Sequence, residues 1–586
     1  MKQKIYSEGT ERITFRGFPG IDLRYPLDGR RGAAVADNFR IGRDGSLVGR
    51  CGFGKKCSFT GKIDGIADLA SGIYMCSENK VYTIDRTTGE ISGGAAELLA
   101  NAGGRVGFLE LDGSVFIADG TSVKVYDGEA AALRDMNGYA PLVGRLWDPE
   151  KGGEPYESEN LASDRIRITF LVKEAVNRLR TGGYAPRSID LIEHDGEELD
   201  TSSITFNAQS GAIEGPAECF PAGVISVWMT IRKSPQNGSF ATVRGFATAN
   251  AAGAGVLFAY GAAGYNGTAY PYIFRSKPVS DDDMEETGRA YAEADRVYFP
   301  ESGRFFSNTG SYPVTGICPF DDRVLIFSEN AALAIPFPFE GEPFPVQVDP
   351  VAGCANAYSF ARLGDSVISV SENGIFLLTP DRESFCSFAA RRLSAPLGSG
   401  RLFVSNDDMS LFVSELTDEV FFVGTGFGEG KTPVYSVESE CFYTYSGFSP
   451  VFMLSCAGEN CFFDGTRFCG FSETRDYDTA QDSLSPVAVR REYRSCLIPV
   501  ADPGRVRRPS RIGVSAALED NTATLTLLDA AGKTVSSHTL TGTQNVPYVA
   551  FSVRPARKRG SFFAFSLVSA SGGPARIFDL MLEAGE

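Results

Sequence analysis

The stretch GICPFDDRVLIFSENAALAI (residues 316–335) holds two apolar runs joined by the polar residues SEN. Four apolar residues on either side of a short polar break predict two β-strands and a tight turn. Asn suits such a turn because it tolerates a left-handed backbone. Nearly the same phrase occurs as IYMCSENKVYTID (73–85) and as VISVSENGIFLLTPD (367–381). This recurrence indicates that one hairpin unit is repeated along the chain.

The spacing of these phrases is regular. Steps of 43 residues separate four turn positions, Ser328, Ser371, Ser414 and Ala457. Ser77 and Ala118 mark two further hairpins that lie 41 residues apart. A period of ~40–45 residues with one hairpin per period is typical of the four-stranded blades of a propeller. The alternative is that this spacing arises by coincidence among the strands of an ordinary sandwich. Four turn positions at the same spacing disfavour that alternative. The sequence therefore predicts an all-β fold, a six- or seven-bladed β-propeller.

An inserted domain is predicted to interrupt the propeller. Ala118 and Ser328 are 210 residues apart where one blade step needs 43, so 167 residues are extra. A seventh blade either lies within this excess or is built from both ends of the chain. We therefore divide this part of the chain into a first propeller part, an inserted β-rich domain and a second propeller part, at 1–148, 149–295 and 296–472.

The remaining segments are predicted from local composition. Within the insertion, helical spacing or capping predicts short helices at 173–179 and 280–296. Residues 473–486 are polar and poor in strand formers, which is typical of a linker. Residues 487–586 contain several consecutive strand patterns and predict a C-terminal β-sandwich or jelly roll.

Charge is unevenly distributed. The net charge is −17, which disfavours bulk attraction to phosphate backbones or anionic lipids. The first 483 residues hold 43 basic and 65 acidic residues, whereas the rest of the chain holds 13 basic and 8 acidic ones. The N-terminal residues include no apolar run of signal-peptide length, and the most apolar stretch (251–264) is too short to span a bilayer. We expect synthesis in the cytoplasm and no membrane association.

The residues of common catalytic and metal sites are scarce. The chain has two histidines, His194 and His538, which lie far apart in sequence. The sequence therefore disfavours both a metal site with histidine ligands and a Ser–His–Asp catalytic triad. Cys456, Cys461 and Cys469 lie near a hairpin, where core packing is favoured over a metal or a disulfide. The sequence predicts no cofactor, no metal and no enzymatic activity.

Two basic runs lie in the C-terminal module. They are RVRRPSR (505–511) and RPARKRG (554–560), and neither contains the interleaved aromatic residues that would favour nucleic-acid contact. We interpret them as a rim that meets acidic neighbours of the same assembly, with phosphate contact as the alternative. The candidate residues of this oligomer interface are Arg507, Arg508, Arg557 and Lys558.

The beginning of the chain resembles the opening of tailed-bacteriophage virion propeller proteins. The stretch FPGIDLRYPLDGRRGAAVADNFRIGRDGSLVGRCGFGKK (18–56) carries their Gly-Ile-Asp, a strand with Asn, and a Gly turn that leads to Arg-x-Gly. The matching residues are Gly20, Ile21, Asp22, Asn38, Gly45, Leu47, Arg50 and Gly52. Residues 294–335 and 558–586 are similar to the middle and the terminal strand pair of the same proteins. Pro300 departs from the pattern, where Ser is common.

The resemblance implies a structural protein of the virion, at the neck or tail. Proteins of this family include DNA-stabilising hubs and tail nozzles that form rings, commonly hexamers, around the DNA exit path. The implied partners are further copies of the chain, other neck or tail proteins, and genomic DNA that passes without sequence-specific binding. An acidic wall would repel the duplex during passage. No catalytic residue carries over from the resemblance.

Two other functions stay open on the sequence. The first is a host-recognition or glycan-binding propeller at the virion surface. Its candidate residues are the aromatic side chains Tyr265, Tyr270 and Tyr272 of the insertion. The second, which the sequence favours less, is a glycan hydrolase, which would need paired carboxylates at the mouth of a channel.

Overall fold

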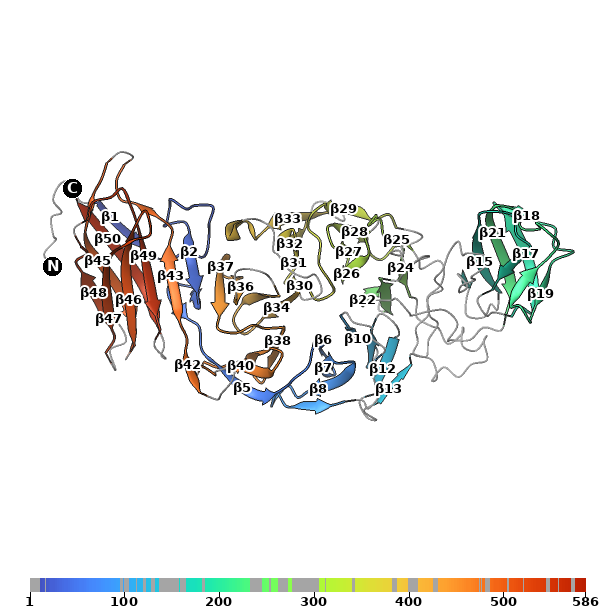
Figure 1. Cartoon of the computed structure of the whole chain (residues 1–586), viewed down its shortest axis with the longest axis horizontal. Helices are drawn as coiled ribbons and strands as arrows, with labels where there is room; N and C mark the ends of the chain where they lie inside the picture. The colour runs from blue at the N-terminus through green and yellow to red at the C-terminus, as the bar shows by residue number, and fades with distance from the viewer. Residues whose placement is uncertain are drawn as a thin grey trace.

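The fold was analysed in a computed structural model of the chain (Figure 1). The structure describes residues 11–15, 17–94, 99, 105–111, 113–119, 123–127, 132–135, 157–158, 165–181, 185–231, 245–251, 254–261, 272–276, 305–310, 312–339, 343–381, 387–398, 409–424, 430–473, 475, 477–479, 485–502, 505–519, 521–543, 549–556, 558–570 and 575–585. Their regular structure is β-strand apart from one short 3-10 helix, Ala395–Leu397. The predicted all-β class is confirmed. No helix in this described part is long and apolar enough to cross a membrane.

In the described part of the chain, seven groups of four antiparallel strands form the middle of the molecule (Figure 1). The first two groups are β6 (Ile63–Leu69), β7 (Gly72–Ser77), β8 (Lys80–Ile84) and β9 (Ile91–Gly93), and β10 (Gly107–Leu111), β11 (Ser114–Ala118), β12 (Val123–Asp127) and β13 (Ala132–Asp135). The third is β22 (Gly245–Ala251), β23 (Ala254–Tyr260), β24 (Tyr272–Arg275) and β25 (Phe305–Phe306). The fourth is β26 (Val314–Pro319), β27 (Arg323–Ser328), β28 (Ala332–Pro336) and β29 (Val346–Asp349).

The other three groups follow in sequence. The fifth is β30 (Phe360–Leu363), β31 (Ser366–Ser371), β32 (Gly374–Pro380) and β33 (Phe388–Arg392). The sixth is β34 (Ser410–Ser414), β35 (Glu419–Val423), β36 (Lys431–Ser436) and β37 (Cys441–Ser446). The seventh combines β38 (Phe452–Cys456), β39 (Glu459–Phe463) and β40 (Arg467–Phe471) with β5 (Phe53–Ser58), so both halves of the chain build it.

The first strands of neighbouring groups contact one another. β10 contacts both β6 and β22, β22 contacts β26, β30 contacts β34, β34 contacts β38, and β38 contacts β6. The fourth and fifth groups contact through β29 and β33 and share an apolar core that includes Leu325 and Phe376. Cores between groups explain the short strands, because each sheet buries its faces against the next sheet instead of against helices.

The recurring turns fall into two sets. Ser77, Ala118, Ser328 and Ser371 each end the second strand of a group, as the repeat predicts. Ser414 instead ends a first strand, β34, and Ala457 directly follows another, β38, so the prediction that all six turns are equivalent is wrong. The chain between β33 and β34 (residues 393–409) takes the length that one strand would take in the repeat. Ser414 therefore lies 43 residues after Ser371 but ends a first strand instead of a second one. The 43-residue period therefore matches different hairpins on either side of these residues.

Polar side chains join equivalent turns of adjacent groups. The Asn373 amide donates to Asn330 Oδ1 at 3.2 Å, and the Asn460 amide lies 3.4 Å from Thr417 Oγ1. The members of both pairs are 43 residues apart. Asn79 has φ 66°, as expected for a left-handed turn. At the other two SEN turns Asn therefore links neighbouring sheets instead of supplying left-handed backbone.

The inserted strands form a separate small body with its own core. One sheet has the order β14 (Glu157–Ser158), β15 (Arg165–Val172), β21 (Gly223–Thr230), β17 (Ser188–His194) and β18 (Glu197–Glu198). The other contains β16 (Arg178–Arg180), β20 (Ala212–Glu214) and β19 (Thr205–Asn207). Their core includes Phe170 and Phe220. Figure 1 shows these strands at one end of the molecule.

The insertion differs from its predicted form. The predicted helix at 173–179 is absent: these residues form bends, an isolated bridge at Val176 and the start of β16. Val176 pairs with Phe220, and this tertiary pairing overrides the helical spacing. β22 to β24 fall inside 149–295 but belong to the third central group. The predicted helix at 280–296 lies outside the described residues.

The C-terminal sandwich takes strands from both ends of the chain. One sheet joins β3 (Phe39–Ile41), β4 (Leu47–Gly49), β50 (Arg576–Gly585), β45 (Arg508–Ala517) and β48 (Val549–Val553), with β1 (Glu11–Phe15) also on β50. The other contains β43 (Arg491–Ser495), β49 (Phe562–Ser569), β46 (Thr522–Asp529) and β47 (Thr534–Thr541), with β44 (Ile498–Pro499) on β49. Figure 1 shows β1 and β50, the first and last described strands, side by side here. The N-terminal strands β1, β3 and β4 therefore belong to the sandwich and not to the central groups, because they pair with strands that would otherwise be exposed edges.

One strand makes the sandwich continuous with the central groups. β2 (Ala33–Asp37) pairs in parallel with β37 and antiparallel with β43, so the sixth group and the second sandwich sheet form one sheet of ten strands. A short hairpin of β41 (Tyr477–Thr479) and β42 (Pro486–Ala488) lies in the chain between the two regions.

Candidate functional site

One arginine joins the N-terminal segment, the central groups and the segment that leads into the sandwich. Arg50 directly follows β4 and is 3% exposed. Its Nε donates to Asn38 Oδ1 (2.7 Å), and its Nη1 donates to Cys51 O (2.9 Å) and Asp478 Oδ1 (2.8 Å). Its Nη2 donates to Ser446 O (2.7 Å) and Asp478 Oδ2 (2.6 Å). All five guanidinium donors are thus satisfied, and the contact with Asp478 is bidentate.

Asn38 positions this arginine from the turn between β2 and β3. Its φ of 57° is left-handed, which Asn adopts more readily than most residues. Its Oδ1 accepts from Arg50 and from the Ser446 amide at 2.9 Å. Its Nδ2 donates to Ser446 Oγ (2.9 Å) and to Arg490 O (2.7 Å). The motif Asn therefore supplies both the backbone turn and four hydrogen bonds to three segments.

Aromatic rings surround the guanidinium. The centroids of four rings lie 5.7 to 5.9 Å from Arg50 Cζ, those of Phe53, Tyr445, Phe448 and Phe471. These rings exclude water and present their negative faces to the cation. The low polarity strengthens the bonds to Asp478 and raises the cost of losing either partner.

A second ion pair holds the adjacent segment. Arg467 donates to Asp464 Oδ2 from Nε (2.8 Å) and Nη2 (2.7 Å), and both side chains are buried. Arg467 Nη1 also donates to Thr479 O at 3.0 Å. Strand β41 is thus held through Asp478 by one arginine and through Thr479 by another. Its residues lie within 473–486, the predicted linker, and they are fixed to the central groups.

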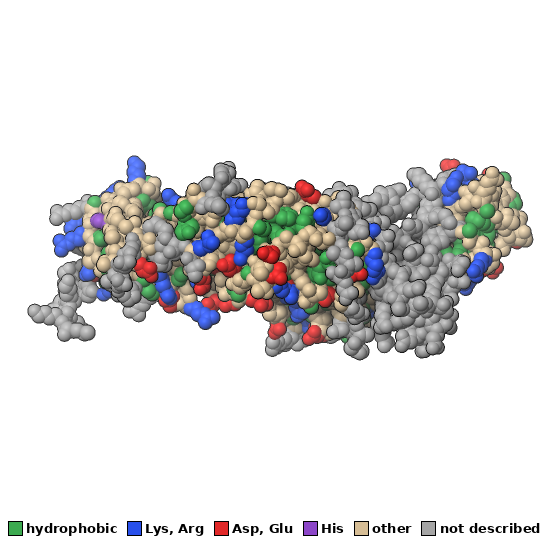
Figure 2. Space-filling view, turned by 90° about the horizontal axis from the view of Figure 1, so that it is seen from below, with side chains coloured by type: hydrophobic (Ala, Val, Ile, Leu, Met, Phe, Trp, Pro, Cys, Tyr) green, Lys and Arg blue, Asp and Glu red, His purple; other side chains and the backbone are tan. Residues whose placement is uncertain are grey.

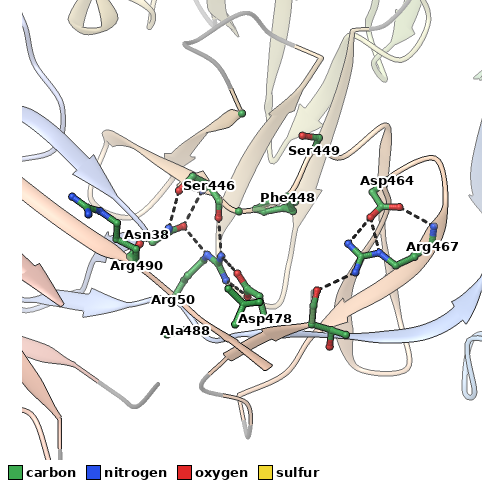
Figure 3. A pocket seen from close by; sticks show the side chains of 14 residues that line it. Asn38, Arg50, Ser446, Phe448, Ser449, Asp464, Arg467, Asp478, Ala488 and Arg490 are labelled. Atoms are coloured by element: carbon green, nitrogen blue, oxygen red, sulfur yellow. Dashed lines mark hydrogen bonds and ion pairs between the residues drawn. The ribbon is translucent and has the colours of Figure 1, made fainter. Parts of the chain in front are cut away.

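The two ion pairs line an open hollow of about 520 Å³ (Figure 3). Its walls come from the ends of β37 and β40, from β41 and β42, and from the loops next to them. Figure 3 shows Arg50 and Asp478 on one side and Asp464 and Arg467 on the other. The two carboxylates of this hollow each receive two N–H bonds from an arginine. They act as anchors for β41, and neither is left as a free proton acceptor.

The pKa of Asp464 is lowered. Burial acts to raise this pKa, but hydrogen bonds from Arg467 and Thr466 outweigh it. The ionised carboxylate therefore stabilises the fold above its unfolded pKa of about 3.9. This stability is lost as the pH falls through the lower, folded-state pKa.

Asp464→Asn is expected to lower the free energy of unfolding at pH 7 by about 2 kcal/mol, because Arg467 loses an ionic acceptor. The difference between the variant and the unaltered protein should shrink as the pH falls below about 4, where the native carboxyl is protonated. Urea unfolding from pH 7 to pH 3 measures it. Asp68→Asn is the control, because Asp68 pairs with Arg86 at half-exposed positions, and it should change the free energy by less than about 1 kcal/mol. A pH-independent difference would contradict this account of Asp464.

The other residues of the N-terminal resemblance also occupy tight places. A Cβ on Gly20 would lie 2.6 Å from Phe442 O, and one on Gly52 would lie 2.1 Å from Tyr477 O. Gly45 has φ 76° in the turn between β3 and β4. Sequence reasoning identified Asn38 and Arg50 only as parts of a motif and missed their partners. No sequence signal links them to Asp478, which is 428 residues from Arg50.

The predicted interface residues that the structure describes lie on the sandwich, and Figure 2 shows basic side chains at that end of the molecule. The four residues were Arg507, Arg508, Arg557 and Lys558. The amide of Arg507 donates to Gly560 O at 2.9 Å, and Arg508 begins β45. Lys558 forms an ion pair with Asp529 of the same chain, and its hydrogen bond lowers the pKa of Asp529. Arg557 lies outside the described residues.

The other predicted residues are dispersed. Tyr265 and Tyr270 lie outside the described residues, and Tyr272 begins β24, where it pairs with Phe306. His194 ends β17, and its Nε2 lies 2.9 Å from Ala222 O; His538 lies on β47. The structure does not bring the two histidines together.

The cysteines of the seventh group are free thiols. Cys456, Cys461 and Cys469 are buried in apolar cores. Cys456 Sγ lies 3.3 Å from Asp85 O. Burial raises the pKa of both Cys461 and Cys469 to about 12, so they are protonated at neutral pH. Among the residues that the structure describes, no group of three or more His, Cys, Asp or Glu side chains is placed to hold a metal.

No protein-family model and no curated protein sequence matches the chain. Solved structures do match it at low similarity. The AfRom2 CNH domain is 7% identical, over 72% of this chain and 99% of that chain, with a TM-score of 0.34. A glycoside hydrolase family 43 arabinoxylan arabinofuranohydrolase from Bacillus subtilis is 12% identical, over 74% and 94%, with a TM-score of 0.21. The enzymatically active domain of tailspike protein 4 from bacteriophage CBA120 is 19% identical, over 16% and 14%, with a TM-score of 0.12.

These comparisons correct one prediction. Glycoside hydrolases recur among the matched structures, so the prediction that the chain is not an enzyme is contradicted. The TM-scores are all below 0.5, and the likeness therefore identifies neither a substrate nor an active-site residue.

Proposed function

We propose that the chain is a structural protein of a tailed-phage virion and assembles into a homo-oligomeric ring, a hexamer, at the neck or tail. The ring would line or close the path along which DNA leaves the particle, next to other neck or tail proteins. The observation that carries this proposal is the junction at Arg50. The residues through which the chain resembles virion propeller proteins are the ones that fasten its N-terminal segment to β37 and β41.

Such a junction suits a protein that transmits load. The sixth central group continues through β2 into the sandwich as one hydrogen-bonded sheet. The ion pairs of Arg50 and Arg467 fix β41 beside that sheet. Force applied to the sandwich would thus reach the central groups through paired backbone and buried ionic contacts and not through a loose linker.

We infer further that the seven central groups close into a seven-bladed propeller. The contacts between first strands run from β6 through β10 and β22 to β26, and from β30 through β34 and β38 back to β6. The fourth and fifth groups meet through β29 and β33. β5 completes the seventh group with a strand from the first part of the chain, a closure that ties the two halves together.

The charge distribution is compatible with contacts between copies. Acidic residues exceed basic ones before residue 484, and basic residues exceed acidic ones after it. Figure 2 shows most of the acidic side chains of that face over the central groups, away from the basic end. Unlike charges at opposite regions would guide neighbouring copies into a head-to-tail contact, which closes into a ring when its rotation permits.

Assembly of the purified full-length chain tests the proposal. We expect particles of about six copies in sedimentation velocity and rings in negative-stain electron microscopy, at concentrations that favour association. A protein that stays monomeric at every concentration, and that is also absent from particles of the virus that encodes it, would exclude the structural role.

The double charge reversal Arg507→Glu with Arg508→Glu is expected to weaken ring assembly at physiological salt by at least about tenfold, since charged rims act within a Debye length of ~8 Å. Lys62→Glu with Lys80→Glu gives the same change in net charge, just before β6 and at the start of β8, and should leave assembly unchanged. Sedimentation across a salt series measures both. If the two variants assemble equally well, Arg507 and Arg508 do not contribute to the interface.

A further inference from the structure

A second hollow lies on the other side of Arg50. It has a volume of about 670 Å³ and opens between the sixth and seventh central groups, within the range of about 300–1,000 Å³ that is usual for small-molecule sites. Arg50 lines both hollows and separates them. The hairpin turns after β34 and β38 and the ends of β4, β40 and β43 line it. Leu416, at the turn after β34, is 54% exposed at the hollow.

A buried carboxylate borders this hollow with one oxygen uncommitted. Glu419 begins β35 and is 2% exposed. Its Oε1 accepts hydrogen bonds from Tyr443 Oη (2.5 Å) and Tyr445 Oη (2.8 Å). Burial and the charge of Glu419 raise the pKa of both tyrosines, so they remain donors. In the part of the chain that the structure describes, both tyrosine hydrogen bonds end on Oε1. Oε2 is not among the fully buried side-chain atoms that lack a partner, so it remains accessible.

Charges of both signs line the hollow. Arg40, Arg475 and Arg491 lie around it together with Glu419 and Glu473. Two further charged side chains line the hollow: Arg50, which is paired with Asp478, and Glu459, which is neutralised by Lys56 at 2.9 Å. A small anion would meet the carboxylates, and a small cation would meet the guanidinium groups. A neutral molecule that both donates and accepts hydrogen bonds can satisfy both kinds of side chain. It does so without burying two charges of the same sign next to each other.

The hollow also presents apolar surface. Phe421, Tyr445 and Phe471 line it, and each is at least nine-tenths buried. Sugars combine hydroxyl groups, which bond to carboxylates and guanidinium groups, with C–H faces that pack on aromatic rings. We propose that this hollow binds a neutral carbohydrate of about disaccharide size, and that Glu419 Oε2 accepts a hydrogen bond from one of its hydroxyl groups.

This site is separate from the rim residues Arg507, Arg508 and Lys558 of the sandwich, none of which lines the hollow. Glu419 lies on β35, Arg40 on β3 and Arg491 on β43, so the site exists only where the sixth and seventh groups meet the N-terminal strands. Ring assembly is not needed for it. A monomeric protein that binds sugar would contradict the proposed assembly alone, and a ring without sugar binding would contradict this proposal alone.

Saturation-transfer NMR on the full-length protein with maltose, lactose, cellobiose and xylobiose tests the site. We expect at least one of the four to bind with a dissociation constant of about 1 mM or lower. Leu416→Trp, which fills the mouth from an exposed position, should weaken that binding at least about tenfold. Val351→Trp places the same side chain at an exposed valine after β29, outside the hollow, and should leave binding unchanged.

The variant Glu419→Gln provides a second test of the site. Gln keeps an acceptor for the two tyrosine hydroxyl groups but replaces the open carboxylate oxygen, so sugar binding should fall about tenfold. Thermal unfolding of each variant separates a loss of ligand from a loss of fold. The proposal is overturned if none of the four sugars binds, if Leu416→Trp and Val351→Trp bind equally, or if sulfate or spermidine binds at the hollow in their place.

Discussion

Replacing Arg50 by Met is expected to lower the free energy of unfolding by about 3–5 kcal/mol. Methionine has a comparable length and fits among the aromatic rings, so the main loss is electrostatic. Asp478 would remain at a side-chain exposure of 8% without its bidentate partner. Ser446 O and Asn38 Oδ1 would each lose a donor as well. Chemical unfolding followed by near-ultraviolet circular dichroism measures the change, because aromatic rings surround the site.

A double-mutant cycle separates the pair from its surroundings. Asp478→Leu alone should destabilise the fold, but Arg50→Met combined with Asp478→Leu should cost less than the sum of the single changes, because no buried charge is left unpaired. The control is Arg43→Met, which removes an arginine that is 79% exposed and paired with Glu438. It should change the free energy by less than about 1 kcal/mol. Additive effects of Arg50 and Asp478 would show that the two residues act independently.

The class of fold could be predicted because strand and turn signals are local. The SEN turns at Ser77, Ser328 and Ser371 each mark the end of a second strand, and together they predict repeated hairpins. The third group escaped detection for a physical reason. Its strands β23, β24 and β25 are separated by residues 261–271 and 276–304, so no fixed spacing remains in the sequence. Strand pairing tolerates long connections, because loop closure costs little more as a loop lengthens.

The composition of the sandwich could not be predicted from the C-terminal residues alone. Residues 487–586 do contain most of its strands, but β1, β3 and β4 come from the first 50 residues. β1 pairs with β50 from Glu11 opposite Ala584 to Phe15 opposite Leu580. A pairing over this separation leaves no trace in local periodicity. The same reason hides the junction, since Arg50 and Asp478 meet only after the two ends of the chain have come together.

The second hollow did leave a partial signal. Tyr443 and Tyr445 alternate on β37, so one face of that strand carries two hydroxyl groups, and Glu419 begins the apolar run EVFFV. A carboxylate next to an apolar strand and a tyrosine pair at strand spacing together indicate a buried polar contact. The sequence predicted a hairpin at Ser414, which includes the Glu419 stretch, but the tyrosine pair was not singled out. Their contact across β35, β36 and β37 could be established only from the sheet order.

Gly52 shows how the motif glycine and the ion pairs depend on each other. Its amide donates to Arg475 O at 2.7 Å, and its carbonyl accepts from the Ser472 amide at 3.1 Å. This pairing brings its Cα against the backbone of Tyr477, at the start of β41. A Cβ at Gly52 would lie 2.1 Å from Tyr477 O and 2.6 Å from Tyr477 N. Backbone atoms cannot rotate away as a side chain does, so β41 itself would have to move.

Gly52→Ala is therefore expected to lower the free energy of unfolding by about 3 kcal/mol, the upper end of the usual cost of overpacking. β41 cannot withdraw without lengthening the bonds from Arg50 to Asp478 and from Arg467 to Thr479. Gly93→Ala is the matched control, since the nearest atom to its added Cβ, Lys80 Nζ, lies at 3.7 Å, and its effect should stay within about 0.5 kcal/mol. In an Arg50→Met background β41 is held less firmly, so Gly52→Ala should then cost clearly less than it does alone. An unchanged cost in that background would mean that the ion pair does not hold β41 against Gly52.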